Sequence, residues 1–233
     1  MKRCAIMQPT YLPWSGYFHL MTQVDVFVLL DDVQFQRRSW HTRNRILLQG
    51  REHMLTVPVA AAHQRDRLHQ VQTVAEEPWR ARHWATLSAA YAKAPHGRAL
   101  LDLLQPLYQA PLADRGLTAW NESLIRTLAQ ALGIDTPLVR ATTLGCGGQR
   151  SEHLLNLCLA LGCDSYLSPR GSREYLEEDE FEANAQVALD FQQFDPKPYA
   201  QLRAESFVSH LSVIDVIAQQ GVSFAARYVR GEA

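Results

Sequence analysis

An arginine-rich segment behind two adjacent aspartates is the part of the sequence best suited to binding chemistry. Asp31 and Asp32 end an apolar run. Four arginines follow them in close succession, namely Arg37, Arg38, Arg43 and Arg45. The planar guanidinium fork suits phosphate or carboxylate oxygens, whereas lysine would serve as well on a solvated face. The sequence therefore predicts that at least two of these arginines converge with Gln8 and Asn44 on one pocket for an anionic ligand.

The same segment offers groups for catalysis and for stacking. One of the carboxylates of Asp31 and Asp32 is a candidate general base. Trp40 is suited to stack on a base or a sugar ring, and Gln34 joins it as a candidate for substrate binding. The alternative interpretation is an exposed loop whose arginines and aspartates pair with one another.

A second group of candidates lies in the loop between an apolar run at residues 3–7 and a helix expected at residues 16–23. Its candidate binding residues are Gln8, Tyr11, Trp14, Gly16 and Tyr17. Ligands of open α/β sheets bind beyond the carboxyl ends of the strands, and a helix N-terminus attracts anions through its unpaired N–H groups. His19 on the expected helix is a further candidate for proton transfer. The alternative is a proline-stiffened loop that packs its aromatic side chains into the core.

Two later turns between a strand and a helix are weaker candidates for anion binding. One contains Arg170, Gly171 and Ser172, and the other is the glycine turn at residues 145–148. The glycine turn matches neither the Walker lysine pattern nor G-x-G-x-x-G. An ordinary capped turn is the alternative for both. The histidines and cysteines show no metal-ligand spacing, so we expect no metal site, and the sequence names no cofactor.

The composition is that of a globular protein without a bias toward nucleic acid. Hydrophobic residues make up 47% of the chain and charged residues 20%, with a formal net charge of −1. Duplex-binding proteins usually carry a basic excess, so a nucleic-acid partner is not expected. The four cysteines form no C-x-x-C pair, which favours reduced thiols and a cytoplasmic setting. The apolar N-terminus is too short for a signal peptide, and no apolar run is long enough to span a membrane.

Hydrophobic periodicity predicts an α/β fold with a Rossmann-like, mostly parallel sheet. Strands are expected at residues 3–7, 25–30, 136–144, 165–167 and 186–191, with a β-hairpin at 46–57. Helices are expected at residues 16–23, 78–94, 97–109, 112–132, 151–161 and 211–219. We therefore expect residues 1–233 to form a single domain in which residues 78–132 are a helical subdomain.

Several of these segments together resemble the WbqC-like protein family. The resemblance is carried by Met7 to Phe18 (MQPTYLPWSGYF), Asp31 to Phe35 (DDVQF), Arg38-Ser39-Trp40, Asn44-Arg45-Ile46, Leu55 to Val59 (LTVPV), Tyr166-Leu167-Ser168, and Leu211 to Asp215 (LSVID). His41 departs from the family pattern, and so does the run from Arg170 to Arg173.

The resemblance implies a role in the biosynthesis of surface glycans such as O-antigen. The activity that it implies is transfer of an acyl or aminoacyl group to an activated amino sugar. The expected partners are an anionic substrate such as a nucleotide-sugar, and an acyl carrier. The family brings no settled set of catalytic residues to this sequence.

The sequence allows two alternatives to acyl transfer. The spacing Trp14-x-Gly16-Tyr17 is similar to the H-x-G-H helix start of nucleotidyltransferases and related ligases, although aromatic residues replace both histidines here. The other rival is a non-catalytic binding protein of a glycan pathway. Thermal stabilisation separates the three functions: acyl thioesters or nucleotide-sugars would stabilise a transferase, nucleoside triphosphate with magnesium a nucleotidyltransferase, and neither a non-catalytic protein.

Overall fold

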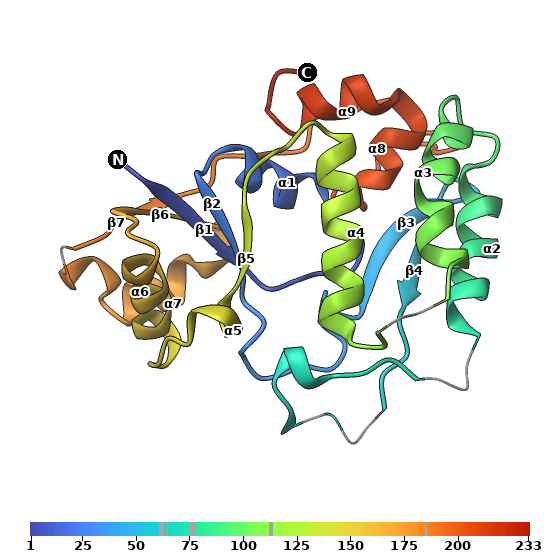
Figure 1. Cartoon of the computed structure of the whole chain (residues 1–233). Coiled ribbons are helices and arrows are strands. Elements are labelled where there is room, and N and C mark those ends of the chain that lie inside the picture. The colour runs from blue at the N-terminus through green and yellow to red at the C-terminus, as the bar shows by residue number, and fades with distance from the viewer. Residues whose placement is uncertain (61–62, 64, 75–77, 112–113, 185) are drawn as a thin grey trace.

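A five-stranded parallel β-sheet lies in one half of the protein, at the left of Figure 1. The computed structural model describes residues 1–60, 63, 65–74, 78–111, 114–184 and 186–233. The strands are β1 (Arg3–Met7), β2 (Val26–Leu29), β5 (Leu138–Arg140), β6 (Ser165–Ser168) and β7 (Ala188–Phe191). They lie in the order β5-β2-β1-β6-β7, and every neighbouring pair is parallel. The strand order therefore reverses at β1, and at such a switch point the carboxyl ends of the strands leave a crevice for a ligand.

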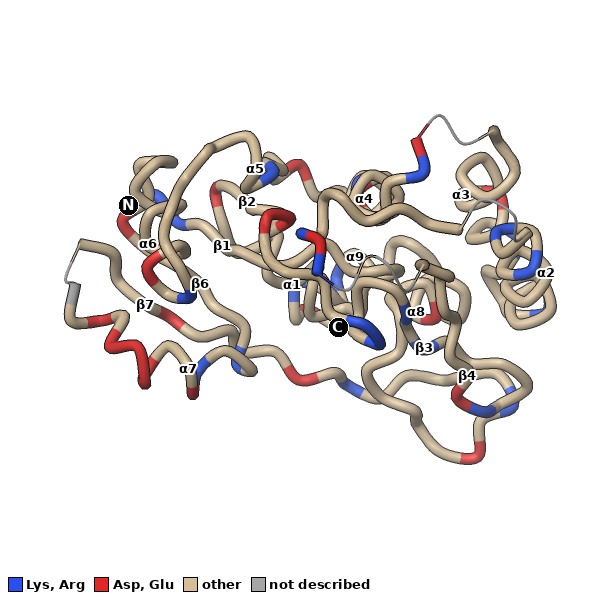
Figure 2. The backbone as a smooth tube through the Cα atoms, turned by 90° about the horizontal axis from the view of Figure 1, so that it is seen from below, with Lys and Arg blue, Asp and Glu red and all other residues tan. Residues whose placement is uncertain are grey.

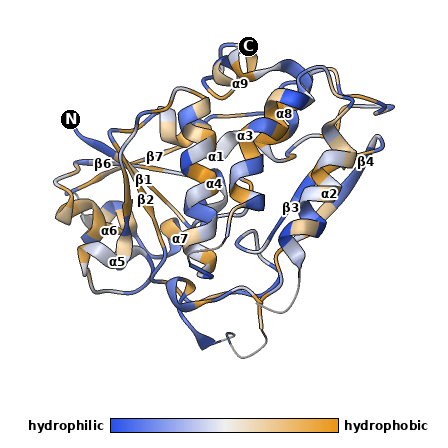
Figure 3. Ribbon diagram, turned by 45° about the vertical axis from the view of Figure 1, so that its right-hand side comes forward, coloured by the Kyte–Doolittle hydropathy of each residue, from blue (hydrophilic) through white to orange (hydrophobic). Residues whose placement is uncertain are grey.

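Helices cover both faces of this sheet because the side chains of each strand alternate between two apolar cores. Ala5 and Phe27 belong to one core, together with α1 (Ser15–Thr22), α4 (Leu117–Ala131), α8 (Val213–Gln220) and α9 (Val222–Tyr228). Cys4 and Ile6 belong to the other core, against α6 (Arg150–Ala160) and α7 (Arg173–Glu178). The strands are correspondingly apolar over most of their length, as Figure 3 shows.

A β-hairpin and two helices form the part of the molecule farthest from the sheet (Figure 1). The hairpin pairs β3 (Arg43–Leu48) with β4 (Arg51–Thr56), and the helices are α2 (Trp79–Tyr91) and α3 (Gly97–Gln109). Helix α2 contacts β3, and α3 contacts α8. Most of residues 78–132 is thus helical, as the periodicity predicts, while the separation of these residues as a subdomain stays a prediction.

The fold confirms the predicted α/β class with its mostly parallel sheet and corrects several boundaries. The strand expected at residues 136–144 ends at Arg140 and continues as the short helix α5 (Ala141–Leu144). Helix α4 begins only at Leu117, and residues 112–113 of the expected helix lie outside the described residues. Helix α9 was not expected; Gly221 separates it from α8. No described helix is long and apolar enough to cross a membrane.

Candidate functional site

A small pocket with aromatic walls lies at the carboxyl end of β1, the strand at which the sheet order reverses. Its volume is about 180 Å³. We call it the aromatic pocket, and its lining residues are Met7, Thr10, Trp14, Tyr17, Trp40, Asn44, Arg45 and His210. They come from β1, the first loop, α1, the segment before β3, β3 itself and the segment before α8. Segments far apart in the sequence therefore meet where an open α/β sheet places its ligands.

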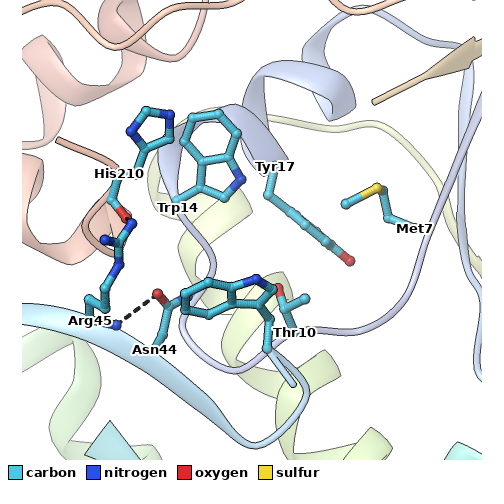
Figure 4. Close-up of a pocket in the computed structure, with 8 residues that line it drawn as sticks. Met7, Thr10, Trp14, Tyr17, Asn44, Arg45 and His210 are labelled. Carbon is cyan, nitrogen blue, oxygen red and sulfur yellow. Dashed lines mark hydrogen bonds between the residues drawn. The ribbon is translucent and has the colours of Figure 1, made fainter. Parts of the chain in front are cut away.

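Helix α1 supplies one wall of the pocket, formed by Trp14 and Tyr17 (Figure 4). Trp14 precedes the helix, and its ring lies directly against Gly16. A Cβ atom at Gly16 would lie only 2.2 Å from Cζ2 of Trp14. The same ring stacks on His210 with centroids 4.9 Å apart. Glycine at position 16 is thus required by the close approach of the indole, which occupies the helix start where an anion was expected.

Asn44 joins the first loop to the hairpin. Its buried Nδ2 donates hydrogen bonds to the carbonyl oxygens of Tyr11, at 3.0 Å, and Leu12, at 2.8 Å. The backbone N–H of Tyr11 also donates to the carbonyl of Trp40, at 2.9 Å. These bonds confirm that the first loop and the segment after β2 lie side by side at the carboxyl ends of adjacent parallel strands. They also hold Tyr11 itself in the core, where its hydroxyl bonds His83 and Tyr108.

Arg45 is the only one of the four clustered arginines that lines the aromatic pocket with Asn44. Its Nη1 lies 3.0 Å from Oε2 of Glu52, and its Nη2 donates to the carbonyl of His210, also at 3.0 Å. Its guanidinium also lies over the ring of Trp40, 5.6 Å from the centroid. Arg45 is thus a fixed, partly neutralised cation at the side of the pocket.

The other three arginines point into a different hollow, so the predicted convergence of at least two of them with Gln8 and Asn44 was wrong. Arg37, Arg38 and Arg43 line a cavity of about 340 Å³. Within this segment, Arg38 takes a left-handed backbone conformation with φ 59°. Gln8 lines neither cavity, and its Oε1 lies 2.6 Å from Nε2 of the buried His41. Burial lowers the pKa of His41 to about 4, so this imidazole is neutral.

The two adjacent aspartates are bound to other parts of the sheet edge and do not line the aromatic pocket. Asp31 is fully buried, and its carboxylate accepts hydrogen bonds from the backbone N–H of Thr142, at 3.0 Å, and from the hydroxyl of Thr142, at 2.9 Å. It thereby holds the first turn of α5, which explains why the strand expected there ends early. Asp32 instead pairs with His153 of α6, with 3.0 Å between Oδ2 and Nε2.

Hydrogen bonds favour the charged forms of both Asp32 and His153. The Nδ1 atom of His153 lies 3.0 Å from the carbonyl of Gly147, so both ring nitrogens face acceptors and the charged imidazolium is favoured. Burial raises the pKa of Asp32, but the hydrogen bond and charge of His153 outweigh burial, and the net pKa is lowered. The hydrogen bond to Asp32 raises the pKa of His153 against the opposing effect of burial.

This pair predicts a bell-shaped dependence of stability on pH. The contribution of Asp32 is present above its unfolded pKa of about 3.9 and is lost as pH falls through its lowered folded value. That of His153 is present below its unfolded pKa of about 6.5 and is lost as pH rises through its raised folded value. We expect His153→Gln to cost about 2 kcal/mol near pH 5.5, somewhat less than a fully buried pair would lose. Urea unfolding across pH 4–8 measures this.

A more exposed histidine pair provides the control for that experiment. His63 and Asp66 lie 2.7 Å apart, but the side chain of Asp66 is 41% exposed, against 9% for Asp32. Since solvent screens exposed pairs, His63→Gln should cost less than about 1 kcal/mol. An equal loss in both variants, or a loss that does not change with pH, would contradict the assignment of His153 as the charged partner.

The remaining predicted site residues lie away from the aromatic pocket. His19 is buried on α1, where its Nδ1 accepts from Nε2 of Gln192 at 2.9 Å, and burial lowers its pKa. Arg170 donates to the carbonyl of Gln192 and pairs with Asp195. Gly171 and Ser172 belong to the short 3-10 helix that contains Arg170, and Gln34 is an exposed residue bridged to Arg67.

Sequence reasoning missed Met7, Thr10 and above all His210. His210 has a left-handed backbone conformation with φ 58°, which is uncommon for a residue other than glycine and costs free energy that the surrounding structure must offset. No motif marks this residue in the sequence. Among the residues that the structure describes, no group of three or more histidine, cysteine or acidic side chains is placed to hold a metal ion.

Comparison with known proteins agrees with the motifs in the first loop and after β2. A model of the WbqC-like protein family matches residues 8–226. The chain belongs to this family. The uncharacterized protein Rv1507c of Mycobacterium tuberculosis is 31% identical over 233 residues, which cover 99% of this chain and 98% of that protein. No solved structure matches the chain. The family match spans every residue of the aromatic pocket except Met7.

Proposed function

We propose that this protein transfers an acyl or aminoacyl group to the amine of an activated amino sugar in surface-glycan biosynthesis. The observation that carries the proposal is the aromatic pocket. Trp14, Tyr17 and Trp40 offer flat apolar faces, while Thr10 and Arg45 add polar groups at the same cavity. A pyranose ring has both apolar faces and polar edges, so a pocket of this kind suits a sugar better than a wholly apolar ligand.

His210 is the proposed proton acceptor. It lines the pocket, and its Nδ1 lies 2.9 Å from the hydroxyl of Ser209, while no hydrogen bond engages its Nε2 in the described part of the chain. An imidazole is suited to accept a proton near neutral pH. Asp31 and Asp32, which the sequence put forward for this step, are engaged by Thr142 and His153. His19 lies outside the pocket.

The proposed reaction balances with an acyl thioester as the co-reactant. The sugar amine attacks the thioester carbonyl carbon and forms the new C–N bond. The carbon–sulfur bond breaks, the thiolate leaves with the bonding electrons, and the amine proton passes to Nε2 of His210 and then to the thiolate. The products are an N-acylated sugar and a free thiol. The pocket's contribution is to hold the amine and the carbonyl in a reactive orientation.

The test is to incubate the purified protein with a nucleotide-linked amino sugar and acetyl or glycyl thioesters, and to measure the acylated sugar by mass spectrometry. Trp40 is exposed and contacts the proposed sugar, so Trp40→Ala should raise KM about tenfold with a smaller change in kcat. Leu159→Ala, which removes an exposed apolar side chain on α6, should leave both constants unchanged.

A non-catalytic glycan-binding protein is the second candidate, and one observation favours it. Both carboxylates that the sequence offers as bases are bonded away from the aromatic pocket. If the amino sugar binds the wild-type protein but no thioester yields an acylated product, the transferase proposal fails and the binding protein replaces it.

A further inference from the structure

A second cavity, separate from the aromatic pocket, is built around three arginines. We call it the arginine hollow. Its lining residues are Phe35, Arg37, Arg38, Thr42, Arg43, Thr56, Val57, Pro58 and Val59. At about 340 Å³ it is nearly twice as large as the aromatic pocket, at about 180 Å³. Its walls come from the loop after β2, the start of β3 and the end of β4.

The positive charge in this hollow is not balanced by any residue that lines it. The lining contains no acidic side chain, and within the described chain none of the three guanidinium groups makes a hydrogen bond or an ion pair. The Nε atom of Arg43 is buried and lacks a partner. The nearby Asp66 directs its carboxylate to His63. Arg37 and Arg38 are exposed and Arg43 is partly buried, so their guanidinium groups are available to an anion that enters the cavity.

Eight other arginines of the described chain form ion pairs with acidic side chains. Ion pairs with aspartate or glutamate are formed by Arg3, Arg45, Arg98, Arg126, Arg140, Arg150, Arg170 and Arg173. The acidic residues around α7, which are red in Figure 2, belong to the sheet part of the molecule. Arg37, Arg38 and Arg43 lie outside this paired set, and they line one cavity together.

The backbone that carries the three arginines is held in place before any ligand binds. The hydroxyl of Ser39 donates to the carbonyl of Gln36, at 2.7 Å, and the N–H of Val57 donates to the carbonyl of Thr42, also at 2.7 Å. Phe35 is buried beneath the loop, and its N–H donates to the carbonyl of Asp66. A fixed backbone lowers the entropy that is lost on binding, because only side chains must be ordered.

The arginine hollow adjoins the aromatic pocket through one strand and one loop. Arg43 lines the hollow and Arg45 lines the pocket, and both project from the same face of β3 because side chains alternate along a strand. Two residues along a strand correspond to about 7 Å. Trp40 of the pocket follows Arg38 of the hollow in the same loop. One ligand with a ring at one end and phosphate groups next to it can therefore reach both cavities.

We propose that the arginine hollow binds the diphosphate of a nucleotide-activated sugar whose ring occupies the aromatic pocket, an inference that rests on the function proposed above. Arginine forks match phosphate oxygens in pairs, and three of them suit two linked phosphates. The hydroxyl of Thr56 adds a donor at the same cavity. The hollow is a cavity of limited volume with Phe35, Val57 and Pro58 in its walls, which favours a small ligand over the acidic face of a protein partner.

Calorimetric titration with inorganic pyrophosphate and with uridine diphosphate tests the proposal. Both ligands should bind the wild-type protein, and their affinity should fall steeply with added salt. Arg38→Ala and Arg43→Gln should each weaken binding by about tenfold to a hundredfold, the scale of a charge-assisted hydrogen bond. Arg38 is exposed, so its replacement leaves the fold intact even if Arg43→Gln does not. The control is Arg98→Ala on α3, whose side chain is 88% exposed and paired with Asp102.

The outcomes separate this inference from the proposed transfer reaction. Absence of pyrophosphate binding to the wild-type protein, or unchanged affinity in Arg38→Ala, would overturn the inference, and so would an acidic carrier protein that binds the hollow while pyrophosphate does not compete. Pyrophosphate binding that these arginines control, without acyl transfer, would leave the inference standing and remove the transferase. Acyl transfer to a sugar without phosphate, at an unchanged rate in Arg38→Ala, would support the transferase and overturn the inference that the arginine hollow binds a diphosphate.

Discussion

Replacing Asn44 by alanine is expected to destabilise the protein by about 3 kcal/mol and to abolish binding at the aromatic pocket. The amide donates to two buried carbonyl groups and accepts the N–H of Arg45 at 2.8 Å. Each buried partner that is left without a hydrogen bond costs about 1–3 kcal/mol. These bonds hold the first loop against β3. In Asn44→Ala, Trp14 and Arg45 are therefore no longer held in fixed positions relative to each other. Urea unfolding and titration with an amino sugar measure the two effects.

An exposed amide provides a matched control for that substitution. Gln105 on α3 donates from Nε2 to Oε1 of Gln109 at the surface, at 2.8 Å. Because water replaces such a bond, Gln105→Ala should change the free energy of unfolding by less than about 0.5 kcal/mol. A loss below about 1 kcal/mol in Asn44→Ala, or intact ligand binding in that variant, would show that the first loop keeps its position without this amide.

Replacing His210 by asparagine is expected to lower kcat of the proposed transfer by about a hundredfold or more, with little change in KM. A positioned general base contributes about 10²–10⁴-fold to a rate. Asparagine is the suitable replacement because it tolerates the left-handed conformation that His210 adopts, with φ 58°. The stacking of the His210 ring on Trp14 is lost as well, so thermal stability and sugar affinity must be measured alongside the rate.

The pH profile separates a role in proton transfer from a role in packing. If His210 transfers the proton, the pH profile of kcat in His210→Asn should differ from that of the wild-type protein. Added imidazole should restore part of the lost rate. A variant that loses rate through a raised KM alone, or that keeps the wild-type pH profile, would assign His210 a structural role next to Trp14.

The order and type of most elements follow from the sequence for clear physical reasons. Residues 26–29 form a buried parallel strand because an unbroken apolar run suits a sheet that is covered on both faces. Trp79, Leu87 and Tyr91 lie on the buried side of α2, so the spacing of apolar residues along this segment predicts a helix. The juxtaposition of the first loop with the segment after β2 was likewise predictable, because both follow neighbouring parallel strands.

Tertiary contacts alone decided where the charged side chains of the site point. Asp31, Asp32 and Arg45 are near one another in the sequence, but their partners are Thr142, His153 and Glu52 respectively. The first two partners are distant in sequence, and Glu52 lies on the opposite strand of the hairpin.

No motif in the sequence indicates that Arg45 lines the aromatic pocket while Arg37, Arg38 and Arg43 line the arginine hollow. His210 reaches the pocket because the chain before α8 returns to the first loop, where the N–H of Val213 donates to the carbonyl of Pro13. The sequence by itself therefore determines the sheet and the loops at its carboxyl edge. Only the packed structure determines which side chains share a cavity, because long-range hydrogen bonds set their directions.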